Sequence, residues 1–142
     1  MPRLPVIALA LLLAALAAGC GRGQDADGAH PDMDAAGSVL EWRGSLPCAD
    51  CEAIDTRLLL ERRGDERVYE LMEVYVAVDG DMSFEESGRW SLDDGLLDLE
   101  AAGGGVRRYG LVQGGALQVR DPRGRTYPGR EHDLLLPAGH HP

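Results

Sequence analysis

The fold of this chain is decided by residues 54–65, which read IDTRLLLERRGD. Ile54, Thr56, Leu58 and Leu60 occupy every second position, so in an extended chain their side chains point to one face. The intervening positions are mostly charged, although a third leucine interrupts the alternation. The Gly-Asp pair that follows is typical of a chain reversal. The stretch therefore predicts a β-strand that is buried on one face and ends in a turn.

The same pattern of short apolar runs broken by turn residues continues outward from this strand in both directions. Asp-Gly and Gly-Gly pairs between the runs supply the positive φ angles that tight hairpin turns require. No stretch after residue 20 has a long helical stripe. The run at 67–78 is apolar on both faces, so its inward face is ambiguous. The expected strands are Val39–Gly44, Ile54–Arg63, Arg67–Val78, Phe84–Leu92, Leu96–Glu100, Arg107–Val112 and Leu117–Asp121, with a weak last strand near Asp133–Leu136.

Closely spaced strands joined by tight turns predict an all-β fold, a small antiparallel meander. Closing the meander into a β-barrel removes its exposed edges, which would otherwise pair with other chains. Residues 39–142 are long enough for one such domain.

The first residues of the chain have the layout of a secretory signal. A basic start at Arg3 is followed by an uncharged stretch of mostly Leu and Ala, and small residues then lead to Cys20. The apolar stretch is too short to span a bilayer comfortably, which takes about 20 residues. A cysteine at this point resembles a bacterial lipobox, in which the thiol receives a diacylglyceryl group. The alternative is an ordinary secreted protein with a chance cysteine. We therefore expect a signal peptide at 1–19 and lipidation of Cys20.

Residues 20–38 are rich in Gly, Ala and Asp and contain almost no large apolar side chains. Such a composition predicts a flexible tether between the lipid and the domain. The formal charge of the whole chain is −10. This charge argues against nucleic-acid binding, which needs basic clusters, and against a polybasic contact with anionic lipid.

The most specific local motif is the segment LPCADCE at 46–52, between the first two expected strands. With Cys20 acylated, Cys48 and Cys51 remain as a pair. A disulfide is favoured by the oxidising cell envelope. A soft-metal site is the second interpretation, with Cu(I) preferred by thiolates. A thioredoxin-type oxidoreductase is the third, but it needs a βαβ context and a lowered thiol pKa, which the nearby carboxylates disfavour.

Further metal ligands would have to come from elsewhere in the chain, because tetrahedral zinc needs four and no second CxxC exists. The candidates, which count only if the fold brings them close, are His132, His140, His141, Met33, Met72 and Met82. No Ser-His-Asp order or carboxylate pair stands out, so we expect no catalytic residues and no enzymatic activity.

Residues 42–56 read WRGSLPCADCEAIDT, and this segment closely resembles the N-terminal domain of the NlpE family, the copper-resistance and surface-sensing lipoproteins of Gram-negative bacteria. Weaker matches follow at Leu58, Leu60, Tyr69, Tyr75, Phe84, Gly88, Trp90, Tyr109, Ala116, Leu117, Asp121 and Gly124. The resemblance implies a lipocalin-like β-barrel with Cys48 and Cys51 at one end and Cys20 as the lipidated residue. It also implies an outer-membrane lipoprotein that reports envelope stress to a two-component sensor and is linked to copper tolerance. Gly21, after the acylated cysteine, resembles the outer-membrane sorting signal.

The best-known family members carry a second, C-terminal domain, for which this chain has no room before Pro142, so functions of that domain are in doubt. We expect a non-enzymatic envelope lipoprotein whose CxxC responds to oxidation or to Cu(I). Its expected partners are the membrane, through the lipid, and an envelope stress sensor. The alternative is a lipocalin-like carrier of a small ligand with a structural disulfide, which a sizeable apolar cavity would favour and a filled barrel would exclude.

Overall fold

The structure, a computed structural model, describes residues 32–141. It consists of eight antiparallel strands that close into a barrel in sequence order, with β8 pairing back onto β1. The strands are β1 (Val39–Leu46), β2 (Ala53–Arg63), β3 (Glu66–Val76), β4 (Met82–Asp93), β5 (Leu96–Ala101), β6 (Val106–Leu111), β7 (Leu117–Arg120) and β8 (Leu134–His141), with the short 3-10 helix η2 (Gln113–Gly115) before β7. The predicted all-β meander and its closure are confirmed.

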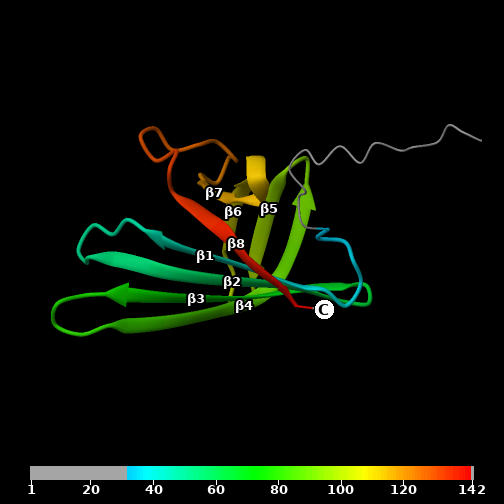
Figure 1. Cartoon of the computed structure of the whole chain (residues 1–142), viewed down its shortest axis with the longest axis horizontal. Helices are drawn as coiled ribbons and strands as arrows, with labels where there is room; N and C mark the ends of the chain where they lie inside the picture. Colours follow the sequence, from blue (N-terminus) through cyan, green and yellow to red (C-terminus); the bar gives the residue numbers. More distant parts are fainter. Residues whose placement is uncertain (1–31, 142) are drawn as a thin grey trace, which may run out of the picture.

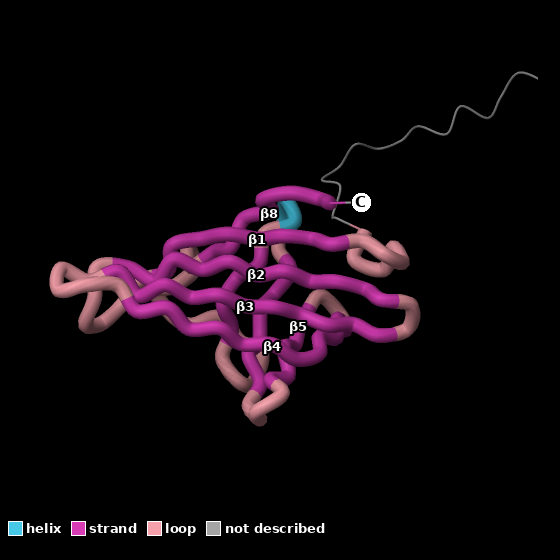
Figure 2. Tube along the Cα trace, turned by 90° about the horizontal axis from the view of Figure 1, so that it is seen from below, coloured by secondary structure: helices cyan, strands magenta, loops and turns pink. Residues whose placement is uncertain are grey.

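The strands differ in length, and this difference shapes the barrel. β2, β3 and β4 have 11, 11 and 12 residues, whereas β5, β6 and β7 have 6, 6 and 4. Figure 1 shows the long strands extending past the short ones, towards the β1–β2 and β3–β4 connections at the left. In Figure 2, β8, β1, β2, β3 and β4 lie side by side as one continuous wall. One end of this wall therefore lacks a facing wall of short strands.

The inward face of each strand follows the period-two pattern. β2 buries Thr56, Leu58 and Leu60, as predicted, and β3 buries Tyr69 and Leu71, which resolves the ambiguity of that strand. Large side chains fill the middle of the barrel, so the structure gives no support to a carrier with a hollow centre. The core consists mainly of Leu40, Trp42, Leu46, Leu58, Leu60, Tyr69, Leu71, Trp90, Leu97, Leu99, Tyr109, Leu117 and Leu135.

Two positions show how turns and close contacts are encoded. Asp94 and Gly95 have φ angles of 47° and 73°, the positive values that a two-residue hairpin turn needs between β4 and β5. Gly88 in β4 lies so close to β5 that an added Cβ would be 1.9 Å from the carbonyl oxygen of Glu100. Only glycine fits there.

The end of the predicted tether is folded against the barrel. Residues 32–38 form turns, and Met33 is only 5% exposed because it packs into the core. The amide of Gly37 donates to the carbonyl of Arg62 (2.9 Å), and Arg67 pairs with the Asp34 carboxylate (2.5 Å). This segment, cyan in Figure 1, lies at the end of the barrel opposite the β1–β2 connection. The rest of the predicted tether, the signal peptide and Cys20 lie outside the described residues.

Within residues 32–141, no helix is both long and apolar enough to cross a bilayer.

Candidate functional site

The CxxC segment forms the connection between β1 and β2. β1 ends at the buried Leu46, and the chain then turns through Pro47 and re-enters the barrel at Ala53. Cys48 and Cys51 form a disulfide with a Cα–Cα distance of 5.3 Å, and both residues are half-buried. The predicted pairing of these two cysteines is thus present, in its oxidised form.

This loop lies against the β3–β4 hairpin. The amide of Glu52 donates to the carbonyl of Val76 (2.9 Å), which continues the β2–β3 ladder by one bond. A shallow hollow of about 350 Å³ separates residues 49–52 from residues 77–79. The loop is thus hydrogen-bonded to the end of β3 at the residue that follows Cys51.

Among the metal-ligand candidates whose side chains the structure describes, Met82 lies at this end of the barrel, exposed at the start of β4 and paired with Tyr75. The other candidates lie elsewhere. Met33 is in the core at the opposite end, and Met72 pairs with Arg57 and Glu85 in the middle of the long strands. His132 lies exposed in the β7–β8 connection. The structure does not describe the side chains of His140 and His141. Among the residues that it does describe, no group of three His, Cys, Asp or Glu could hold a metal ion.

The two sulfurs can serve a soft metal only in their reduced form. A thiolate pair with Cα atoms 5.3 Å apart provides two soft donors, which suits Cu(I) better than tetrahedral zinc. Disulfide sulfurs carry no charge, so the oxidised loop lacks the thiolates that a metal site needs.

A second polar group, which the sequence did not reveal, lies inside the barrel near the same end. Arg107 of β6 donates from both terminal nitrogens to the Glu73 carboxylate (3.0 and 3.1 Å) and from Nε to Glu86 (3.2 Å). The hydroxyl of Tyr69 donates to the same Oε1 of Glu86 (2.9 Å). The charge of Glu73, only 6% exposed, is balanced by this bidentate pair, as burial requires. We refer to Glu73, Glu86 and Arg107 as the inner ion cluster.

The pKa values around this cluster reflect burial and the neighbouring charges. Burial and the hydrogen bond to Glu86 raise the pKa of Tyr69 above its usual range. Burial raises the pKa of Tyr109 to about 12. Burial alone would lower the pKa of Arg107, but the Glu73 and Glu86 carboxylates outweigh it and raise that pKa. All three groups therefore stay protonated at neutral pH.

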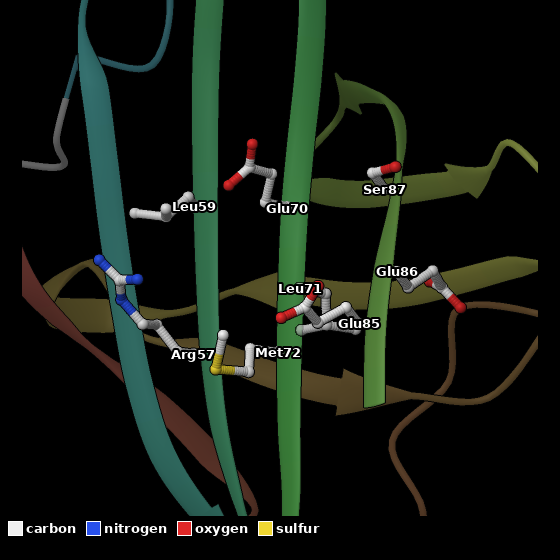
Figure 3. Close-up of a pocket in the computed structure, with 8 residues that line it drawn as sticks. All are labelled: Arg57, Leu59, Glu70, Leu71, Met72, Glu85, Glu86 and Ser87. Atoms are coloured by element: carbon white, nitrogen blue, oxygen red, sulfur yellow. The ribbon is translucent and has the colours of Figure 1, made fainter. Parts of the chain in front are cut away.

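A separate pocket of about 440 Å³ lies over β2, β3 and β4. Figure 3 shows Arg57 and Leu59 on one side and Glu85 and Ser87 on the other, with Glu70 between them. It mixes charges of both signs on exposed side chains and contains neither cysteine.

Comparison with known proteins places the site in a family. A family model described as the NlpE N-terminal domain matches residues 42–130, which include the CxxC loop and the inner ion cluster. The chain belongs to the NlpE family.

Lipoprotein NlpE of Escherichia coli (strain K12) is 33% identical over 122 residues, which cover 84% of this chain and 50% of that protein. The crystal structure of the Cpx pathway activator NlpE from Escherichia coli superposes with a TM-score of 0.54 at 34% identity, covering 63% of this chain and 46% of that one. The chain thus spans about half the length of the NlpE relatives that it matches. The residues that the family model matches run from Trp42 in β1 past β7 and include Cys48 and Cys51 of this chain.

Proposed function

We propose that this chain is an outer-membrane lipoprotein, anchored through Cys20, that takes part in envelope stress sensing and copper tolerance. Its responsive element is the Cys48–Cys51 pair, and its partner is an envelope stress sensor. The family membership and the description of the Escherichia coli NlpE structure as that of a Cpx pathway activator support this role. We propose no catalytic activity for it.

The observation that carries the proposal is the position of the disulfide. The Cys48–Cys51 loop joins β1 to β2 and is hydrogen-bonded to the end of β3, at the opposite end of the barrel from residues 32–38. Since the chain from Cys20 enters at residues 32–38, the disulfide lies at the end of the barrel farther from this point of attachment. A sensor in the periplasm could then reach it.

The Cys48–Cys51 disulfide would be reduced by thiol–disulfide exchange. A dithiol reductant gives two electrons and two protons to the disulfide, forms its own disulfide, and leaves Cys48 and Cys51 as thiols. Cu(I) then binds both sulfurs and displaces their protons. Reduction removes the covalent link between Cys48 and Cys51, and Cu(I) binding joins the two sulfurs again through the metal. The disulfide, dithiol and Cu(I)-bound forms therefore differ in this loop, which we propose faces the partner.

The copper branch is tested by anaerobic Cu(I) titration of reduced protein against a chromogenic Cu(I) chelator. We expect one Cu(I) per chain with wild-type protein and no retained copper with the Cys48→Ser, Cys51→Ser double variant. Equal retention by both proteins would refute a role of the pair in copper binding.

The anchor is tested separately by expressing a Cys20→Ala variant. We expect the wild type in the outer-membrane fraction with a mass increase that matches acylation, and the variant without that mass increase and outside the outer-membrane fraction. An unacylated wild-type protein would refute the anchor without bearing on the copper site.

A further inference from the structure

The inner face of the long strands is open at the CxxC end. The short strands β5–β7 have fewer residues than β2–β4, and the long strands extend past them at this end (Figure 1). Tyr75 near the end of β3 and Phe84 near the start of β4 belong to this extension. Phe84 lies an even number of residues before Glu86 and Trp90 in β4, so its side chain is on the same inward face. It is nevertheless 52% exposed. A hollow of about 240 Å³ lies at this mouth, next to the inner ion cluster.

The charge at the base of the hollow is negative. Glu73 and Glu86 bring two carboxylates to the single guanidinium of Arg107. Glu73 takes up both terminal nitrogens of Arg107, while Glu86 receives one bond from Nε and one from the neutral Tyr69 hydroxyl, both on Oε1. The cluster therefore keeps one net negative charge, and the Glu86 side chain is 30% exposed.

Aromatic rings stand beside this charge. Tyr75 follows Glu73 by two residues in β3, and Phe84 precedes Glu86 by two in β4, so each ring shares the inner face with a carboxylate. The two rings meet edge to face with centroids 5.1 Å apart. The face of an aromatic ring attracts a cation, and the attraction strengthens where water is partly excluded.

We propose that this hollow is a binding site for a small organic ammonium ion, with Glu86 pairing its charge and Phe84 and Tyr75 contacting its apolar part. An anion would meet the net negative charge of the cluster. A neutral apolar ligand would cover the partly exposed Glu86 carboxylate without adding a hydrogen bond to it, which is unfavourable. At about 240 Å³ the hollow suits a ligand smaller than most drug-sized molecules. The inference is independent of the redox state of Cys48 and Cys51.

The test compares three probes of nearly equal shape: phenethylammonium, 2-phenylethanol and phenylacetate. Each is titrated by calorimetry into the full-length protein in zwitterionic nanodiscs, with empty nanodiscs subtracted. We expect phenethylammonium to bind about fivefold more tightly than the alcohol, since about fivefold is the upper range for one partly exposed charge pair. Phenylacetate should not bind measurably.

Variants locate the site. Glu86→Gln should reduce phenethylammonium binding to the level of the alcohol, and Phe84→Ala should weaken it about fivefold through loss of the ring contact. Glu70→Gln is the matched control, because Glu70 is exposed on the opposite face of β3 and should bind as wild type does.

Equal binding of the three probes, absence of saturable phenethylammonium binding, or an equal loss with Glu70→Gln would overturn the proposal. Phe84→Ala removes an exposed side chain, so it decides the question if Glu86→Gln fails to fold.

Discussion

Replacing Glu41 by Gln should destabilise the barrel in a pH-dependent way. Glu41 of β1 is only 4% exposed, and its carboxylate accepts bonds from Arg43 (2.5 Å) and Arg57 (2.9 and 3.3 Å). The hydrogen bond from Arg57 outweighs burial and, with Arg43, lowers the pKa of Glu41 from 4.5 to about 2. The charged carboxylate is therefore favoured in the folded state.

The magnitude follows from that shift. A lowered pKa of this size corresponds to at most ~3 kcal/mol of folding free energy. Arg43 and Arg57 are 62% and 41% exposed, so solvent screening reduces the expected loss in Glu41→Gln to about 1–2 kcal/mol. With a urea m-value of roughly 1–1.5 kcal/mol/M for a domain of this size, the midpoint should fall by about 1 M at pH 7.

The sign of the pH dependence is fixed by the direction of the shift. Because the folded pKa lies below the unfolded one, the stabilisation is complete above about pH 5 and is lost as pH falls from 4.5 towards 2. The difference between wild type and Glu41→Gln should thus be less than about half its neutral value at pH 3.

The assay is urea unfolding followed by tryptophan fluorescence at pH 7, 5 and 3, because Trp42 and Trp90 are buried. The control is Glu61→Gln, whose carboxylate pairs with Arg63 at an exposed part of β2 and should change the midpoint little. A loss that stays constant from pH 7 to pH 3 would show that packing, not charge, accounts for the effect, and a midpoint at pH 7 equal to that of wild type would refute the argument outright.

Three further predictions concern the close contact, the folded segment before β1, and the disulfide. Gly88→Ala should destabilise the barrel by about 2–3 kcal/mol in thermal unfolding, since a Cβ there collides with the backbone of β5. Gly103→Ala, where an added Cβ meets nothing within 4 Å, should be close to neutral, and a similar loss in both variants would contradict this reason. Met33→Ala should reduce the free energy of unfolding by about 2 kcal/mol because it empties a core position; an unchanged value would mean that residues 32–38 do not close that end. Reduction of Cys48–Cys51 should lower the unfolding free energy by only about 2 kcal/mol, because the loop that it closes is short. Loss of cooperative melting after reduction, checked by circular dichroism, would show that the disulfide is a main stabiliser instead.

The sequence predicted most of the strands because their information is local. Alternation along 54–60 fixes which side chains face inward, and positive-φ turn residues such as Asp94 and Gly95 fix where the chain reverses. The observed strand ends differ from the expected ones mainly at β3, which stops at Val76, and at β8, which continues to His141. The β3–β4 connection takes up Ala77 and Val78 as a turn, where an apolar run had indicated more strand. β8 gains its length from pairing with β1, a contact that no local pattern records.

The cysteine pair could be predicted from the sequence, whereas the inner ion cluster could not. Cys48 and Cys51 are three residues apart, so one local turn brings them within bonding range, and the sequence was sufficient to single them out. Glu73, Glu86 and Arg107 come from β3, β4 and β6, and they meet only because the barrel closes with the register observed. In the sequence each looks like an ordinary charged residue of a solvated face. Strand periodicity tells which face a side chain is on, but the wall that it faces is set by long-range pairing, and this the tertiary structure alone decided.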